Sequence, residues 1–155
     1  MRAGRTPVSA GSSSQPGNAR RVRVYVARHG ETEWNVAGRY QGRLESTLTP
    51  LGARQALALA DAMQPLGIGR VLSSPLSRCT ATAQPAADRL GLRVEPEERL
   101  IEIGHGTWEG RLRDEIAAND PERYRAWRSD PAHVRFENGE SIGDVLDRWR
   151  DFAAS

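Results

Sequence analysis

The sequence predicts an α/β fold with three layers, α/β/α, in which helices cover a mostly parallel sheet. Short β-branched segments alternate with segments rich in Ala and Leu, an order typical of βαβ units. Two helical segments open on Thr-Pro or Ser-Pro, which is a helix-start signal. A chain of 155 residues buries one core, so we expect a single domain.

Residues 1–20 are expected to be a disordered extension, and residues 21–155 the folded domain. The extension is rich in Arg, Ser and Gly and has almost no apolar side chains to bury. It lacks the apolar stretch of roughly 7–15 residues found in secretory signals. The first acidic residue is Glu31, and a start that is poor in acidic residues is also typical of organellar transit peptides. Two interpretations of the extension therefore remain, a flexible tail and a transit peptide.

The first strand is predicted at residues 22–27, which are mostly β-branched or aromatic. It leads directly into Arg28, His29 and Gly30, which therefore lie at its carboxyl end. Ligands bind at this edge of open α/β sheets.

A helix is predicted at 51–63, with Thr49 and Pro50 as its start and Pro65 and Gly67 as its end. A second strand follows at 71–73.

The next helix is expected to begin at Ser74-Pro75, by the same cap-plus-proline signal. Pro85 should kink or end it early, and Gly91 should close the region. A weak third strand is expected at 92–94.

Three further helices are predicted, at 112–119, at 122–129 and after Ser141. Ser141 and Asp144 resemble a capping box for the last of them. Its apolar side chains recur at helical spacing, at Ile142, Val145, Leu146, Trp149 and Phe152.

Composition excludes several classes of protein. At 38% hydrophobic and 27% charged residues the chain is typical of soluble globular domains, and no apolar run approaches a membrane span. A net charge of +2 is too small to indicate a nucleic-acid partner. All 22 basic residues are Arg, which codon usage explains, although Arg also makes forked contacts with phosphate. The lone Cys79 fits a reducing compartment, so a cytoplasmic location is expected.

His29 is the first candidate for chemistry, because an imidazole can act as a nucleophile toward phosphorus. Such a site needs a small neighbour, nearby cations and an acid. Gly30 and Arg28 supply the first two locally. These three residues alone are also compatible with a loop histidine that has no role.

Arg78 is the second candidate, since it falls in the first turn of a predicted helix. A cation there opposes the helix dipole unless an anion binds at the helix start. The alternative is an exposed, solvated arginine.

Glu102 is the third candidate. Wedged between Ile101 and Ile103, its carboxyl would have a raised pKa and could serve as a general acid. The alternative is strand alternation, with Glu102 simply facing water.

Taken together, these residues resemble the histidine phosphatase superfamily, also called the phosphoglycerate mutase-like family, from about Val22 to Phe152. The matching segments, in chain order, are Arg28-His29-Gly30-Glu31-Thr32-Glu33-Trp34-Asn35, then Gln41-Gly42 through Leu48-Thr49-Pro50-Leu51-Gly52, then Ser73-Ser74-Pro75-Leu76-Ser77-Arg78-Cys79-Thr80-Ala81-Thr82-Ala83, then Glu102-Ile103 through Gly106-Thr107-Trp108-Glu109-Gly110, and Gly139-Glu140-Ser141.

The resemblance implies that His29 becomes a phosphohistidine, with Arg28 and Arg78 holding the phosphoryl oxygens and Glu102 as the general acid. It implies further substrate-binding groups at Asn35, Gln41 and Gly42. The substrate would be a small phosphorylated molecule, without a metal or other cofactor. The oligomeric state stays open.

Within the family, Gln41 and the short run from Glu102 to Gly110 look like the broad-specificity phosphatase branch rather than the mutases. Glu45, Ser46 and Thr47 depart from the family's usual Asp-Ser-Pro. The family's second catalytic histidine lies on a strand after the Ser141 helix, and the sequence ends at Ser155 before any such strand.

We therefore expect a C-terminally truncated domain that lacks the family's last strand or strands, with exposed apolar residues at 22–26 and weak or absent turnover. His105 and His133 are not expected to substitute for the missing histidine. Three hypotheses stay open: a truncated phosphomonoesterase, a short form that binds phosphorylated ligands without turnover, and a fragment that does not fold stably alone. Mutase-type phosphoryl transfer is the alternative chemistry.

Overall fold

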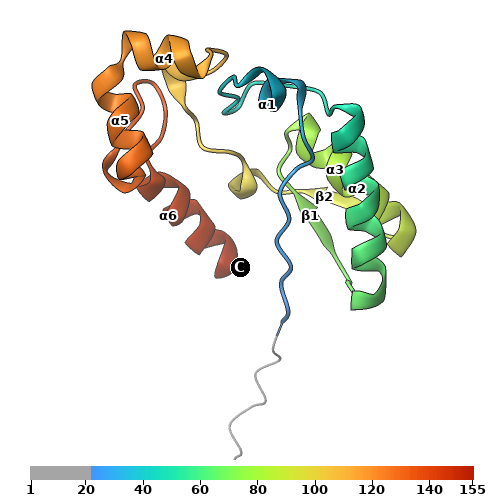
Figure 1. Ribbon diagram of the computed structural model, residues 1–155. Helices are drawn as coiled ribbons and strands as arrows, with labels where there is room; N and C mark the ends of the chain where they lie inside the picture. Colours follow the sequence, from blue (N-terminus) through green and yellow to red (C-terminus); the bar gives the residue numbers. More distant parts are fainter. Residues whose placement is uncertain (1–21) are drawn as a thin grey trace, which may run out of the picture.

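The computed structural model describes residues 22–155, so the extension predicted at 1–20 lies outside the described residues. Figure 1 shows one group of elements built from α2, α3 and a small sheet, and a second group built from α4, α5 and α6. The segment after β2 runs between the two groups. Within the described range, no helix is long and apolar enough to cross a membrane.

The sheet has two strands among the described residues, β1 (Val71–Ser73) and β2 (Val94–Pro96). They pair in parallel, with Val71 opposite Val94 and Ser73 opposite Pro96. Helix α3 (Ser77–Leu90) connects them, which makes a βαβ unit. The predicted α/β class and parallel direction are confirmed.

The strand predicted at 22–27 is wrong, because this segment belongs to no sheet within the described chain. A strand exists only where a neighbour completes its backbone hydrogen bonds, and β propensity alone supplies none. The side chains of Val22, Val24 and Val26 are 83%, 69% and 75% exposed, as the sequence led us to expect. Such a run of unpaired backbone and apolar side chains is an aggregation hazard.

Helix α2 (Pro50–Met63) confirms the helix predicted at 51–63. The Thr49 hydroxyl accepts a hydrogen bond from the Gly52 N–H at 3.0 Å, as an N-cap should. A 3₁₀ turn, η1 (Gln64–Leu66), and a left-handed Gly67 end the helix. Before it, the short α1 (Glu33–Ala37) is capped by Thr32.

The predicted start of α3 at Ser74-Pro75 is wrong by two to three residues. The helix begins at Ser77 after Leu76, which offers no side-chain cap. Instead, the carboxylate of Glu45 accepts from the Ser77 N–H at 3.1 and 3.2 Å and from the Ser77 hydroxyl. The Ser77 N–H at the start of α3 is thus satisfied from a distant loop, which local sequence does not reveal.

Pro85 was predicted to kink α3 or to end it early. The early end is wrong, since the helix continues to Leu90. Ala86 and Ala87, just beyond the proline, are buried together with Ala56 and Ala60 of α2. This packing offsets the roughly 3 kcal/mol local cost of an internal proline. Gly91 closes the helix in the left-handed conformation, as predicted.

Strand β2 lies two residues later than the predicted 92–94. The Leu92 N–H donates to the Ala87 carbonyl at 2.9 Å, so Leu92 still belongs to the end of α3. The chain pairs with β1 only from Val94 onward.

The three remaining predicted helices are confirmed, and each begins within one residue of its predicted start. They are α4 (Arg113–Asn119), α5 (Pro121–Ser129) and α6 (Ile142–Ala153). Ser141 and Asp144 form the predicted capping box. Three further 3₁₀ turns complete the described chain: η2 (Glu98–Leu100), η3 (Gly106–Trp108) and η4 (Pro131–His133).

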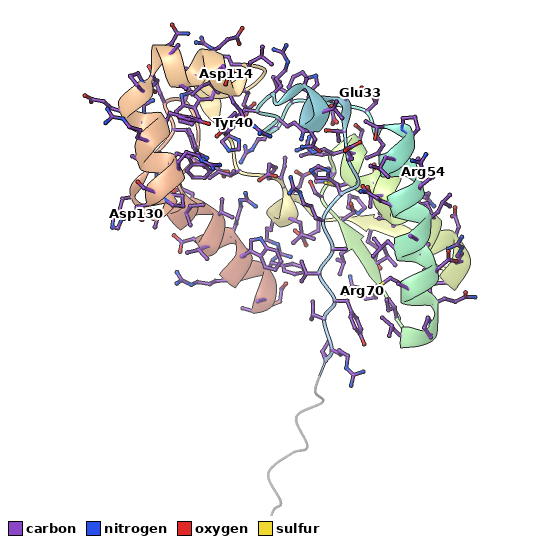
Figure 2. The ribbon with its side chains drawn as sticks, viewed as in Figure 1. Glu33, Tyr40, Arg54, Arg70, Asp114 and Asp130 are labelled. Atoms are coloured by element: carbon purple, nitrogen blue, oxygen red, sulfur yellow. The ribbon has the colours of Figure 1, made fainter. Side chains whose placement is uncertain are left out.

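The main apolar core lies in the α4–α6 group. Its buried members are Ile103, Trp108, Ile116, Val134 and Phe136. Tyr40 packs against this cluster, whereas Asp114 and Asp130 lie on the outside (Figure 2). Because Tyr40 follows α1, this core ties the loop after α1 to the second group of elements.

Substituting Gly52 with alanine is expected to destabilise the fold. A Cβ at Gly52 would lie 2.0 Å from the Glu31 carbonyl oxygen, so either the helix start or the chain beside His29 would have to shift. We expect a loss of about 1–3 kcal/mol in the free energy of unfolding. Chemical denaturation measures it, with Gly69→Ala as the matched control because nothing lies within 4 Å of that position. An equal effect of both substitutions would contradict the close approach.

Candidate active site

His29 lies between the extended segment 22–27 and α1, and it is half-buried. Its Nδ1 is 2.7 Å from the Gly30 carbonyl oxygen. A carbonyl only accepts, so Nδ1 carries the ring hydrogen and Nε2 presents its lone pair. The ring is therefore held in the tautomer that leaves Nε2 available for attack.

The surroundings of His29 favour the neutral ring. Burial lowers its pKa most, and the charges of Arg78 and Arg28 lower it further, against the Gly30 hydrogen bond and the charge of Glu102, which raise it. Arg28, Arg78 and Glu102 are thus near enough for their charges to act on this imidazole. An unprotonated imidazole is the form that acts as a nucleophile.

Gly30 fixes the position of His29 relative to α3. Its N–H donates to the Thr82 hydroxyl at 2.9 Å, and that hydroxyl donates to the Arg78 carbonyl at 2.7 Å. A Cβ at Gly30 would lie 2.5 Å from the Gly52 carbonyl oxygen, so only glycine allows this approach to α2. Two helices thus hold the chain beside the imidazole.

Arg78 is 1% exposed, and its guanidinium is only partly satisfied. Its two terminal nitrogens donate to the carbonyl oxygens of Leu44 at 2.9 Å and of Gly42 at 2.7 Å. Within residues 22–155 its buried Nε has no hydrogen-bond partner. A buried cation held only by neutral carbonyls is costly, and a bound anion would compensate it.

Arg28 and Glu102 are both exposed. Of the two alternatives for Glu102, a carboxyl wedged among apolar groups or one that faces water, the structure shows the second: Glu102 is exposed while Ile103 turns inward. Neither residue is in a strand. One carboxylate oxygen of Glu102 accepts from the Ile103 N–H at 2.9 Å.

The three predicted substrate-binding residues lie close together, and each also has a structural role. The Asn35 side-chain oxygen accepts from the Thr32 N–H at 3.0 Å in the capping box of α1. The Gln41 side-chain oxygen accepts from the Thr32 hydroxyl at 2.9 Å. Gly42 has a φ of 52° and supplies one of the carbonyls that hold Arg78.

Sequence reasoning did not single out two residues that shape the site, Thr82 and Glu45. Thr82 lies one helical turn after Arg78, a spacing that places both on one face of α3. That spacing is the signal that could have found it. Glu45 reaches the start of α3 from a loop, and no local pattern indicates this contact.

The other two histidines lie in different environments. His105 is 8% exposed and packs edge-to-face against Tyr40, Trp127 and Phe136. His133 is exposed, with its Nδ1 2.8 Å from an Asp130 carboxylate oxygen.

Acidification is expected to destabilise the fold through His105. Burial lowers its pKa below the ordinary value of 6.5, so the unfolded chain binds a proton that the folded chain does not. Its contribution to stability is complete above about pH 6.5 and is lost as the pH falls below that value. The free energy of unfolding should therefore decrease from pH 7.5 to 5, and His105→Phe should reduce the slope. An unchanged slope in the variant would contradict this.

Comparisons with known proteins point to one family. Residues 24–155 match the model of the histidine phosphatase superfamily (branch 1). Phosphoserine phosphatase 1 of Hydrogenobacter thermophilus is 40% identical over 131 residues, which cover 84% of this chain and 62% of the relative. A probable phosphoglycerate mutase, GpmB, of Serratia proteamaculans is 38% identical over 130 residues, 84% of this chain and 60% of the relative.

Solved structures agree. A mycobacterial glucosyl-3-phosphoglycerate phosphatase in complex with VO3 superposes with a TM-score of 0.77 at 37% identity, over 81% of this chain and 62% of that one. The Bacillus stearothermophilus protein YhfR superposes with a TM-score of 0.78 at 32% identity, over 82% of this chain and 63% of that one. The chain thus spans about three-fifths of the length of these relatives.

Proposed function

The chain belongs to the histidine phosphatase superfamily, branch 1, and we propose that it is a phosphomonoester hydrolase that acts on small phosphorylated metabolites through a phosphohistidine. One observation carries the proposal: the buried guanidinium of Arg78, held by two carbonyls and with its Nε unpartnered in the described chain, beside a neutral His29. Phosphoryl transfer depends chiefly on positioning and electrostatic stabilisation, which such a site supplies.

In the proposed first step, the Nε2 lone pair of His29 attacks phosphorus. The bond between phosphorus and the ester oxygen breaks, and Glu102, as the general acid, gives a proton to the departing alkoxide. Arg78 and Arg28 stabilise the charge on the remaining phosphoryl oxygens, with the Asn35 and Gln41 amides and the Gly42 backbone as neutral groups nearby. The products are an alcohol and phosphohistidine.

In the proposed second step, water attacks the phosphohistidine. The Glu102 carboxylate takes a proton from the water as the new oxygen–phosphorus bond forms and the nitrogen–phosphorus bond breaks. Inorganic phosphate leaves, and His29 returns to its neutral tautomer with Nδ1–H bonded to Gly30. Exposure of Glu102 gives it access to water, which this step requires.

Two alternatives follow from the same geometry. If the phosphoryl group passed from phosphohistidine to a second hydroxyl instead of water, the protein would be a mutase. The similarity to relatives named as probable phosphoglycerate mutases supports this alternative. Binding of phosphorylated ligands without turnover is the other alternative. It leaves Glu102 without a role.

Hydrolysis and binding, measured side by side, separate these alternatives. We expect release of nitrophenol from p-nitrophenyl phosphate, together with a higher melting temperature in millimolar inorganic phosphate. Thermal protection without turnover supports the binding alternative. The absence of both effects would overturn the proposal. Phosphoryl transfer to an added alcohol in preference to water would favour the mutase.

A further inference from the structure

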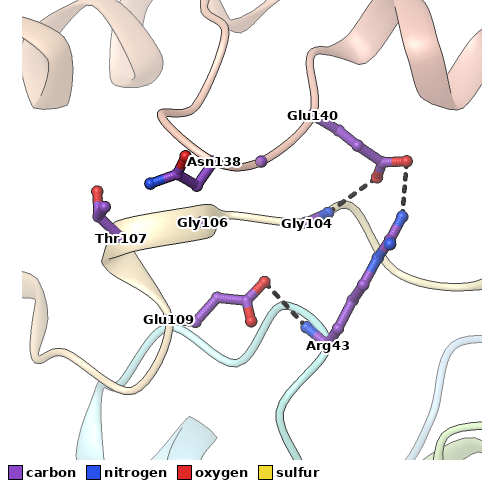
Figure 3. A pocket seen from close by; sticks show the side chains of 8 residues that line it. Arg43, Gly104, Gly106, Thr107, Glu109, Asn138 and Glu140 are labelled. Atoms are coloured by element: carbon purple, nitrogen blue, oxygen red, sulfur yellow. Dashed lines mark hydrogen bonds and ion pairs between the residues drawn. The ribbon is translucent and has the colours of Figure 1, made fainter.

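Two carboxylates, Glu109 and Glu140, line a polar cavity of about 530 Å³ between three loops (Figure 3). Arg43 comes from the loop after α1, Gly104 from the segment after Glu102, and Glu140 from the loop before α6. In the proposed mechanism the first loop supports the phosphate clamp and the second carries the general acid. The contacts that join them are therefore relevant to catalysis.

Glu140 contacts both of these loops at once. One of its carboxylate oxygens lies 2.7 Å from the Arg43 guanidinium, and the other accepts from the Gly104 N–H at 2.9 Å. Arg43 lies between Gly42 and Leu44, whose carbonyls hold Arg78. Gly104 is two residues from Glu102, so this one carboxylate connects the neighbours of both functional groups.

Backbone contacts keep Glu140 close to Gly104. The Glu140 N–H donates to the Gly104 carbonyl at 2.8 Å, so the two residues exchange hydrogen bonds in both directions. A Cβ at Gly139 would lie 2.4 Å from the same carbonyl oxygen, so the approach requires glycine there. The segment after Glu102 is thus fixed to the loop before α6.

Glu109 makes a parallel connection. One of its carboxylate oxygens accepts from the Arg43 N–H at 3.1 Å and from the His105 N–H at 2.9 Å. Glu109 therefore uses backbone donors on both loops, whereas Glu140 uses one side chain and one backbone donor. Two independent links across the same gap hold the loops more firmly than either would alone.

The environment of Glu140 keeps it ionised. Burial alone would raise its pKa, but the Gly104 N–H and the guanidiniums of Arg148 and Arg43 outweigh burial and lower it. Arg148, 3.4 Å away on α6, also donates to the Arg99 carbonyl at 2.7 Å. The side chains of Glu140 and Arg148 are 19% and 16% exposed, so the pair is shielded from solvent more than a surface ion pair.

We propose that Glu140 is a positioning residue, whose carboxylate joins the loop that holds Arg78 to the segment that carries Glu102 and so sets the general acid relative to the phosphate clamp. This inference rests on the proposed function. It assigns no contact between Glu140 and the substrate. Glu140 acts through Arg43 and Gly104.

The test exploits the different need of two substrates for a general acid. Nitrophenolate departs readily without a proton, whereas the alkoxide of glycerol 2-phosphate needs one. Glu140→Gln keeps an oxygen for the Gly104 N–H but loses the ion pair with Arg43. We expect kcat/KM for glycerol 2-phosphate to fall about 10–100-fold and that for p-nitrophenyl phosphate by less than about threefold.

Matched variants separate positioning from stability. Asp147→Asn removes an exposed carboxylate of α6 that pairs with Arg150 at 3.0 Å. It should leave kcat/KM unchanged for both substrates. Arg43→Met should show the same selective loss, and the double variant with Glu140→Gln should lose little more than either single variant. An equal loss for both substrates, or no loss, would overturn the inference.

A second readout does not depend on activity. In Glu140→Gln, hydrogen exchange should accelerate in residues 41–45 and 101–106, and in Asp147→Asn it should not. If the unmodified protein hydrolyses neither substrate, the proposed function fails, and the exchange result alone decides whether Glu140 joins the two loops. Unchanged exchange in Glu140→Gln contradicts the inference in either case.

Discussion

Replacing His29 with alanine is expected to abolish the phosphoenzyme and to reduce kcat/KM for p-nitrophenyl phosphate by at least about 10⁴-fold. Loss of a nucleophile removes the covalent route entirely, so the effect exceeds that of any single phosphate contact. Binding of inorganic phosphate should survive, because the two carbonyls that orient Arg78 belong to Leu44 and Gly42 and are unchanged.

Rapid-quench experiments with the 155-residue chain measure both quantities. His133→Ala is the matched control, since this histidine is exposed and paired with Asp130. It should leave turnover and phosphoenzyme unchanged. Retained phosphoenzyme in His29→Ala would show that another side chain is the nucleophile.

Replacing Arg78 with methionine is expected to weaken phosphate binding and to reduce turnover by about 10²–10³-fold. Methionine fills much of the buried volume but carries no donor. Phosphate would lose the charge that faces it, and the carbonyls of Gly42 and Leu44 would lose their partner. Titration calorimetry with inorganic phosphate and steady-state kinetics measure the two effects.

Arg89→Met provides the comparison for Arg78. Arg89 lies on the same helix and also donates to a backbone carbonyl, that of Leu57 at 2.8 Å, but on the surface. Its loss should leave phosphate binding unchanged. If Arg78→Met binds phosphate as tightly as Arg89→Met does, Arg78 is a structural residue and not part of a phosphate clamp.

The sequence predicted those elements that are specified by adjacent residues. Thr49-Pro50 predicted the start of α2, and Ser141 with Asp144 predicted that of α6, because each cap and the backbone N–H that it accepts from lie within three residues of each other. The start of α3 was missed because its cap, Glu45, lies 32 residues away from Ser77. The strand at 22–27 was wrong because a strand depends on a partner and not on its own side chains.

For the site, the motifs identified which residues matter but not their environments. Arg78 was placed in the first turn of α3, yet its burial and its two carbonyl partners come from the loop of residues 42–44. The flanking Ile101 and Ile103 left open whether Glu102 lies among apolar groups or faces water, because neighbours in sequence do not determine which way a side chain faces in irregular backbone. The roles of His29, Arg28, Arg78 and Glu102 stay predictions.

The central claim is that Nε2 of His29 receives the phosphoryl group, because Nδ1 is committed to the Gly30 carbonyl. The most direct measurement mixes the protein with p-nitrophenyl phosphate, quenches it in alkali, and locates the phosphoryl group by tandem mass spectrometry and ³¹P NMR. We predict one phosphohistidine, at His29 and attached through Nε2. A phosphoryl group on Nδ1, on another residue, or on no residue while nitrophenol is released would contradict the account.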